Sequence, residues 1–541
     1  MLRLPSSDGC YCTGVPHEKP RTPAGLPRGV PFRHRTSDAA RTLPAHWVPQ
    51  RSISVIIDAV DEPEGLELTL AALANQTYAH GLFDVAVALG PTGSDDLSLP
   101  RPERVRTVVS PEGSGHAGAL GAAVDATDGE IVLWLAAGDV PAPDLLAEAA
   151  RCHDQIDDAV VLRTITEVDD EGIHRHDLAE SLDTRVASLL SATRDARDAA
   201  EAPEIDDEGV VLDTALTSIS TPRNLYLLAG GLDPTLPHGG ERDLIYRLAA
   251  RGAALLAAPR AAVLRTGRTA TPRLSEIRLR TADPFDAQRV PLDGGRLRSV
   301  GRVWQVPLIH AVVRPDQATA QYARACVDRL LASRQTDIHV TLVAPAGDGT
   351  DRMQDEFAAV VEWFRGDSRV TLAPTAPDTV FPAAFRLDVP VVAGLSPDTL
   401  DEIIDVATSR HAGLVRVPCP GGDIALLRTA ADERAHRRLP DVDNLQQRID
   451  AVWGVWWARL DGIVDLTTTD DLDAPVRRDD TTAHVSLDAS IEPPSSAPLP
   501  AGAAVEADLP DGFRAPLGLL RAGLRGLLRE LARRLGRRRH R

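Results

Sequence analysis

The stretch Gly129 to Leu146, GEIVLWLAAGDVPAPDLL, constrains the fold of this chain more than any other segment. Its apolar run, Ile131 to Leu135, is too short for a helix and lies between turn residues, so it predicts a buried strand. A polar loop with Asp139 follows, and two prolines then precede a helix that we expect to begin near Asp144. A strand, a loop and a helix in this order favour an α/β fold.

The residues before this stretch show the same alternation of strand and helix. Continuous apolar or β-branched runs predict strands, and leucines or small residues at helical spacing predict the helices between them. The expected strands are Ile53–Ile57, Phe83–Leu89 and Val105–Val109, and the expected helices contain Leu66, Leu70 and Leu73 or span Ala117–Ala126. We therefore predict a doubly wound, mostly parallel sheet that binds ligands at the carboxyl ends of its strands.

A second half begins near residue 301 and has a similar pattern. HVTLVAPAGDGTD at 339–351 resembles DVAVALGPTGSDD at 84–96. The predicted elements are strands at Val306–Val313, Ile338–Val343 and Val389–Val392 and helices at Gln317–Ser333 and 444–460, the last with Trp453, Trp456 and Trp457 at one end as core residues. A duplicated α/β domain is one hypothesis, and two unrelated segments that share only a general α/β pattern are the alternative.

The two ends of the chain differ in composition from these halves. Residues 1–50 are rich in Pro, Arg, Ser and Thr without periodicity, and residues 465–511 are acidic and rich in Thr, Pro and Ser. We expect a disordered leader and a flexible linker there. The predicted domains between and after them are 51–300, 301–464 and a C-terminal helix at 512–541.

The C-terminal segment 512–541 combines a leucine face with a neighbouring arginine stripe. The leucines stand at 517, 520, 524, 527, 531 and 535, and the arginines at 521, 525, 529 and 533. A basic amphipathic helix of this kind binds the surface of an anionic membrane. A solvated helix that packs on the acidic body of the chain is the alternative.

Charge and cysteine usage narrow the possible partners and the compartment. The chain has 59 Lys and Arg against 78 Asp and Glu, a net charge of −19, so its main domains are not expected to bind nucleic acid. Its five cysteines form no metal-type spacing, and the N-terminus shows no signal-peptide core. We expect a cytoplasmic protein, peripheral on the inner face of the cell membrane if the C-terminal helix binds it.

The first half resembles the inverting, nucleotide-sugar-dependent family-2 glycosyltransferases of GT-A fold. The resemblance covers about residues 50 to 268. It is carried, in order, by SISVII at 52–57, QTY at 76–78, GE at 129–130 with the following strand, SISTPRNLYLLAGG at 218–231 and GERDL at 240–244. It implies a GT-A-like sheet, a nucleotide-sugar donor and a glycan or lipid-linked acceptor.

The family's metal-binding Asp-x-Asp motif is degenerate here. Its two positions align with Ala136 and Gly138, and only the following Asp139 remains. The resemblance implies that Asp139 binds the donor diphosphate through Mg²⁺ or Mn²⁺, and one carboxylate predicts weak or absent metal binding. Alternatively, Asp139 is a turn or N-cap residue before Pro141.

Other donor-binding positions are partly substituted. The family's Asp after the second strand aligns with Leu89, and its Asn after the first strand aligns with Asp61. Asp58 and Asp61 lie at the end of the first predicted strand, where they could bind a base or ribose or be solvated loop acids. Gly115, before a predicted helix, is a candidate for phosphate binding. The next residue, His116, is either part of that loop or an ordinary surface residue.

The catalytic base of an inverting transferase is a carboxylate that accepts the proton of the acceptor hydroxyl. Glu241 and Asp243 are the candidates: the family's Asp aligns with Glu241, and Gly240 replaces the preceding Glu. Alternatively, Glu241 only stabilises the N-terminus of a helix.

Three hypotheses follow. The first is an inverting glycosyltransferase, and the second is an inactive, glycosyltransferase-like scaffold or regulatory subunit of a cell-surface polysaccharide assembly system. The third is a metal-independent transferase that binds the diphosphate through arginines, with Arg223, Arg242, Arg265 and Arg268 as candidates.

Overall fold

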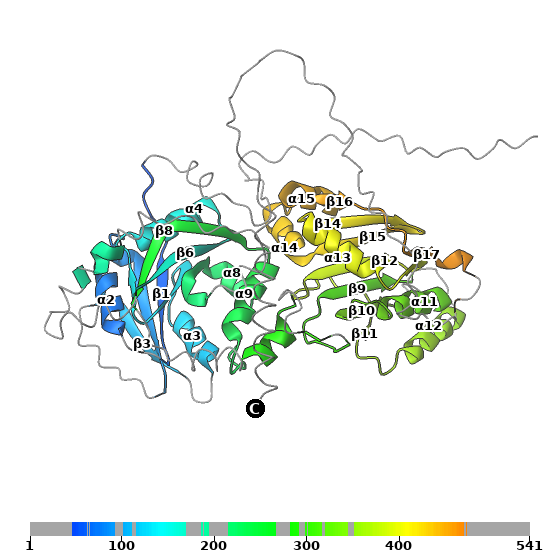
Figure 1. Ribbon diagram of the computed structural model, residues 1–541, viewed down its shortest axis with the longest axis horizontal. Coiled ribbons are helices and arrows are strands. Elements are labelled where there is room, and N and C mark those ends of the chain that lie inside the picture. The colour runs from blue at the N-terminus through cyan, green and yellow to red at the C-terminus, as the bar shows by residue number, and fades with distance from the viewer. Residues whose placement is uncertain are drawn as a thin grey trace, which may run out of the picture. The chain divides into compact units, whose positions relative to one another are not determined.

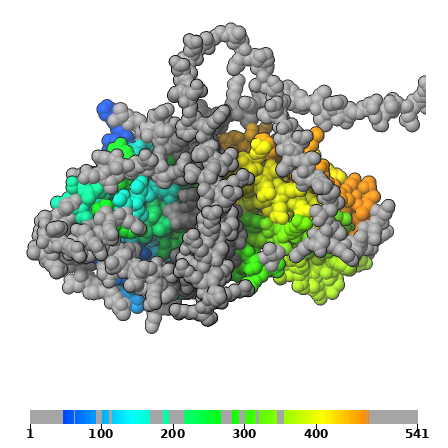
Figure 2. Space-filling model, viewed as in Figure 1, coloured from blue at the N-terminus to red at the C-terminus, as the bar shows by residue number. Residues whose placement is uncertain are grey.

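The computed structural model describes residues 46–472 apart from several internal gaps (Figures 1 and 2). The gaps are 62, 64, 92–100, 111–114, 169–185, 188, 194–214, 267–281, 292–297, 300, 316–319, 345–350 and 470–471. The predicted leader, most of the predicted linker and the 512–541 helix lie outside the described residues. Within the described residues, no helix is both long and apolar enough to cross a membrane.

The first half is built on an eight-stranded sheet in the order β3-β2-β1-β4-β7-β6-β8-β5. The strands are β1 Ile53–Ala59, β2 Phe83–Leu89, β3 Val105–Val109, β4 Ile131–Ala136, β5 Asp139–Pro141, β6 Ala159–Val168, β7 Ile219–Pro222 and β8 Ala254–Thr266. β1 pairs in parallel with both β2 and β4, and β2 with β3. The four strands predicted in this half are therefore confirmed, and they are adjacent and parallel; β6 and β8 also pair in parallel.

Helices cover both faces of this sheet (Figure 1). They are α2 Leu66–Ala74, α3 His116–Asp125, α4 Leu145–Gln155, α8 Arg223–Leu228 and α9 Gly240–Ala250, with short 3-10 turns at His80–Leu82 and Leu216–Ser218. Ile53, Val55 and Ile57 of β1 pack with α2 and α4, whereas Ile56 packs with α3, α8 and α9. Because both faces are buried, the strands read as continuous apolar runs.

The second half repeats the strand order of the first. Its seven-stranded sheet runs β11-β10-β9-β12-β15-β14-β16, and β13 pairs with β17. The strands are β9 Ile309–Arg314, β10 Ile338–Val343, β11 Val370–Ala373, β12 Phe385–Pro390, β13 Ala393–Leu395, β14 Leu414–Cys419, β15 Gly422–Arg428, β16 Val455–Trp457 and β17 Ile463–Asp465. In both sheets the first four strands are parallel and the next two pairings are antiparallel, so the duplicated α/β fold is confirmed.

In the described part of the second half, five helices accompany the sheet. They are α11 Ala320–Leu331, α12 Asp351–Trp363, α13 Thr399–Ser409, α14 Thr429–Arg438 and α15 Leu445–Val452, with a 3-10 turn at Leu466–Thr468. α11, α12 and α13 share one hydrophobic cluster with β9 and β10. α14 and α15 instead share a cluster with α9 and β4 of the first half. Both sheets lie in one compact unit. The domain boundary predicted between residues 300 and 301 is not tested by this division and stays a prediction.

Two predicted elements of the second half were wrong. The strand expected at Val389–Val392 is β12, Phe385–Pro390, because the chain turns after Pro390 and pairs again only in β13. The helix expected at 444–460 ends at Val452, where Gly454, with a φ of 134°, redirects the chain into β16. Trp456 and Trp457 therefore lie on a strand. The prediction missed this break because the spacing of apolar residues does not reveal a change of chain direction that depends on one glycine.

Candidate functional site

Three polar side chains from separate elements meet at the carboxyl end of the first sheet. Asp58 lies near the end of β1, His116 is the first residue of α3, and Glu241 is the second residue of α9. The His116 Nε2 atom lies 3.0 Å and 3.1 Å from the two Asp58 carboxylate oxygens, and its Nδ1 atom lies 3.0 Å from Glu241 Oε1. Open α/β sheets bind ligands at this edge, so the three residues form the candidate site.

Two glycines allow the helix starts to approach so closely. A Cβ atom on Gly240 would lie 2.4 Å from the Ala117 Cβ, and one on Gly115 would lie 2.8 Å from the Leu236 oxygen. Both distances are shorter than real Cβ contacts allow. The Gly240 that replaces the family's Glu therefore brings α9 against α3, and the Gly115 predicted to bind phosphate has a packing role in this structure.

His116 is an imidazolium held between two carboxylates. Burial lowers its pKa, but the hydrogen bonds and charges of Asp58 and Glu241 outweigh that effect and raise the pKa to about 11. Both ring nitrogens therefore carry a proton at neutral pH and donate to carboxylate oxygens. Sequence reading missed this pairing; the only signal was one histidine directly after a glycine at a helix start.

We expect the stability that His116 contributes to depend on pH. Its pKa is higher in the folded protein than the usual value of 6.5, so this contribution is fully present below about pH 6.5 and is lost as the pH rises toward 11. Urea unfolding of the wild type and His116→Gln should show a larger stability difference at pH 6 than at pH 9. An equal difference at both pH values would contradict the imidazolium assignment.

Asp139 pairs with an arginine of the neighbouring strand. It is fully buried at the start of β5, where Arg265 of β8 donates from Nε at 2.7 Å and from Nη2 at 3.0 Å. The Ala136 amide donates to the same carboxylate at 2.9 Å. A metal at Asp139 would have to displace Arg265, and a metal-ligand role for Asp139 stays a prediction.

The other described residues predicted to take part in catalysis or donor binding lie outside the Asp58–His116–Glu241 cluster. Asp243 is buried and accepts from Arg247 Nε and Nη2 at 2.9 Å and 2.6 Å, which gives it a structural partner one helical turn away. Asp61 is exposed just after β1, and Leu89 is buried at the end of β2. Of the arginines considered for the diphosphate, Arg223, Arg242 and Arg265 already bind protein oxygens, and Arg268 lies outside the described residues.

The Asp58, His116 and Glu241 side chains could also hold a divalent metal. Each offers one ligand atom, and these atoms lie within 4.8 Å of one another. Carboxylate oxygens suit Mg²⁺ and Mn²⁺, and imidazole is a common transition-metal ligand. The ring must lose a proton before it can bind a metal, so protons compete with the metal.

The second half does not reproduce this cluster. Ile53 pairs with Ile131 as Ile309 pairs with Phe385, and counting along each strand from these pairs places Arg314 where the first half has Asp58. Ala393, the first residue of β13, takes the place of Asp139. Residues 374–384, between β11 and β12, contain no helix in the place of α3. The polar cluster therefore belongs to the first half alone among the described residues.

The family comparison agrees with this architecture. Residues 54–197 match the family model described as glycosyl transferase family 2. The first half therefore contains a family-2-like glycosyltransferase segment with a GT-A-like fold. The matched segment includes Asp58 and His116 and ends before Glu241. A comparison with curated proteins gave no significant match.

Solved structures similar to this chain include two transferases. One is S. aureus TarS 1-349 in complex with UDP-GlcNAc, at 14% identity and a TM-score of 0.32, covering 45% of this chain and 68% of that chain. The other is the mannosyltransferase PcManGT from Pyrobaculum calidifontis in complex with GDP-Man and Mn²⁺, at 18% identity and a TM-score of 0.30, covering 47% and 68%. Both scores are low, and we draw nothing further from these two structures.

Proposed function

We propose that the chain is a glycosyltransferase that moves a sugar from a nucleotide donor to a hydroxyl of a glycan or lipid-linked acceptor, with inversion. The observation that supports it best is the position of Glu241. This carboxylate lies at the start of α9, at the carboxyl end of the sheet, in contact with His116 of the family-matched segment. Glu241 is about one-third exposed, so an acceptor can reach it.

The proposed reaction uses Glu241 as the general base. The acceptor oxygen attacks the anomeric carbon of the donor sugar, the bond from that carbon to the diphosphate breaks, and the hydroxyl proton passes to the Glu241 carboxylate. A carboxylate has about four acceptor positions, so the contact with His116 leaves others for the acceptor hydroxyl. The His116 ring donates to Glu241 and so orients its carboxylate.

A divalent ion, when bound, would neutralise the charge of the departing diphosphate. Asp58 and His116 are the residues that would hold it, because Glu241 cannot bind metal and accept the proton at the same time. Two protein ligands leave the remaining positions to phosphates and water, which is the usual arrangement for Mg²⁺.

We expect Mn²⁺ to bind weakly to the protein alone and more tightly in the presence of a nucleotide sugar. The donor phosphates complete the coordination, and raising the pH should strengthen binding because His116 must release a proton. Calorimetric titrations of UDP- and GDP-sugars with and without Mn²⁺, at pH 6.5 and 8.5, measure both effects. A tight stoichiometric Mn²⁺ site in the protein alone would show that the ligands are misplaced.

A catalytically inactive scaffold or regulatory subunit is the second candidate. It is favoured by the pairing of Asp139 with Arg265, by Ala136 and Gly138 at the Asp-x-Asp positions, and by Leu89 at a donor-binding position. The same titrations separate the two candidates, because a scaffold of this kind binds no nucleotide sugar with or without Mn²⁺.

The C-terminal segment supports a proposal about location. Its leucine and arginine stripes favour binding to an anionic membrane, which would bring the chain to lipid-linked acceptors on the cytoplasmic face. We expect the full chain to float with liposomes that contain anionic lipid, less so at high salt, and not after truncation behind Asp511. Equal flotation of the truncated chain would rule out this segment as the anchor.

A further inference from the structure

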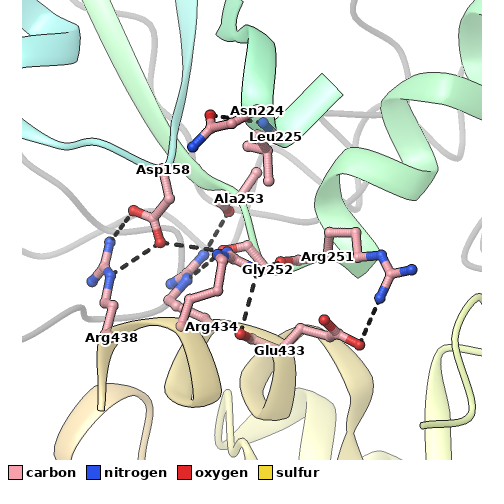
Figure 3. Close-up of polar contacts among 10 residues, drawn as sticks. Asp158, Asn224, Leu225, Arg251, Gly252, Ala253, Glu433, Arg434 and Arg438 are labelled. Atoms are coloured by element: carbon pink, nitrogen blue, oxygen red, sulfur yellow. Dashed lines mark hydrogen bonds and ion pairs between the residues drawn. The ribbon is translucent and has the colours of Figure 1, made fainter. Parts of the chain in front are cut away.

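Arginines of α14 in the second half bind the backbone just beyond α9, the helix that carries Glu241 (Figure 3). Arg434 is fully buried and donates from Nε to the Gly252 oxygen at 2.8 Å and from Nη2 to the Ala253 oxygen at 2.6 Å. Arg437 donates to the Arg251 oxygen and, at 3.1 Å, to the Gly252 oxygen. Because α9 ends at Ala250, these carbonyls lie in its C-terminal cap.

The backbone itself is shaped for this contact. Gly252 has a φ of 74°, and a Cβ atom there would lie 2.3 Å from the Ala430 oxygen and 2.8 Å from the Arg434 Cβ. A side chain at this position would therefore separate α14 from α9. Apolar residues of both helices share one buried cluster, including Leu248 from α9 and Ala431 and Ala435 from α14.

Further side chains join α9 and its cap to the second half. The Tyr246 hydroxyl of α9 donates to the Pro382 oxygen at 2.5 Å. The Arg251 guanidinium binds Glu433 at 2.9 Å and lies 3.6 Å from the centre of the Phe381 ring. Beside them, Arg438 of α14 binds the partly buried carboxylate of Asp158 (Figure 3).

These contacts hold the C-terminal end of α9, and Glu241 lies at the N-terminal end of the same helix. Partial negative charge gathers at a helix C-terminus, where arginines are favourable. An eleven-residue helix is about 16 Å long, so the arginines act on Glu241 only through the helix. Among the described residues, the second half has no counterpart of the Asp58–His116 pair. It therefore has no equivalent candidate site there.

We propose that the second half is a catalytically silent copy that positions α9, so that Arg434, Arg251 and Tyr246 hold Glu241 against His116. The catalytic consequence rests on the proposed function, whereas the structural consequence does not. Arg434, Arg251 and Tyr246 are therefore positioning residues.

The test uses full-length variants that loosen this contact by different amounts. Tyr246→Phe removes one hydroxyl, Arg251→Gln removes the Glu433 pair and the cation–π contact, and Arg434→Lys shortens the buried donor set. Arg365→Gln is the matched control, because Arg365 is an exposed arginine of the second half whose ion-pair partner, Glu362, lies three residues away in the same half. Circular dichroism identifies the variants that fold.

Two readouts are measured on the folded variants. In the wild type, the His116 Nδ1 proton that donates to Glu241 should give an NMR signal at pH 7 that is protected from exchange with water. In the variants this signal should shift or broaden as Glu241 moves away. Under the proposed function, kcat should fall by about 10- to 100-fold, with the donor KM changed by less than about 2-fold, because a displacement near 1 Å has this effect. Arg365→Gln should match the wild type.

The outcomes are distinguishable. Folded variants with a wild-type His116 Nδ1 proton signal and wild-type kcat would overturn the positioning proposal. A chain that shows no transferase activity, but whose variants change this proton signal, would support the positioning and contradict the proposed function. If Arg434→Lys fails to fold, Tyr246→Phe and Arg251→Gln still decide, since each leaves the buried guanidinium in place.

Discussion

Glu241→Gln should reduce turnover by about 10²- to 10⁴-fold, the range that a positioned general base contributes. Glutamine has the same shape and can still accept a hydrogen bond from His116, so α9 and the cluster stay in place. It cannot take a proton from the acceptor hydroxyl. The affinity for nucleotide sugar should therefore remain within about 2-fold of the wild type, because only the transition state loses an interaction.

Initial rates at saturating donor and calorimetric donor affinity measure the two effects separately. Glu402→Gln is the matched control, since Glu402 is a partly exposed carboxylate in the first turn of α13 of the second half. Unchanged turnover in Glu241→Gln would remove Glu241 as the base. Loss of donor affinity with turnover retained at high donor would instead indicate that Glu241 binds the donor or its metal.

Asp139→Ala should lower the free energy of unfolding by about 3–5 kcal/mol, the usual cost of leaving one partner of a buried ion pair without the other. Asp139 is fully buried, and Arg265 is only 15% exposed. A second buried arginine, Arg163, is also stabilised by this carboxylate. The pKa of Arg163 is lowered to about 9 overall, because burial and the charge of Arg265 lower it more than Asp139 raises it. Without Asp139, both arginines lose this countercharge.

Urea unfolding of the wild type and the variant measures this effect. Glu362→Ala, which removes an exposed pair with Arg365, should change stability by less than about 1 kcal/mol. If Asp139→Ala is as stable as the wild type and instead loses Mn²⁺ binding in the presence of nucleotide, Asp139 is a metal ligand. The experiment therefore also decides between the two roles considered for this residue.

The central parallel strands could be predicted from sequence because they are largely buried on both faces. Phe83–Leu89 and Ile338–Val343 are mostly apolar or β-branched segments, and both occur as strands with the predicted bounds. The antiparallel strands were not predicted. β7 has four residues and β5 three, and such short segments carry too little periodicity to distinguish them from loops.

The sequence alone predicted where the helices start, and it identified Glu241 and Asp58 as candidate site residues. Only the tertiary structure brought His116 to Asp58 and Glu241, because the three residues come from three elements far apart in the chain and their contact depends on how closely α3 approaches α9. The same holds for Asp139, whose partner Arg265 is 126 residues away and is opposite it only through the β5–β8 pairing. Local sequence encodes which faces are apolar; the electrostatic environment of a carboxylate depends on long-range packing.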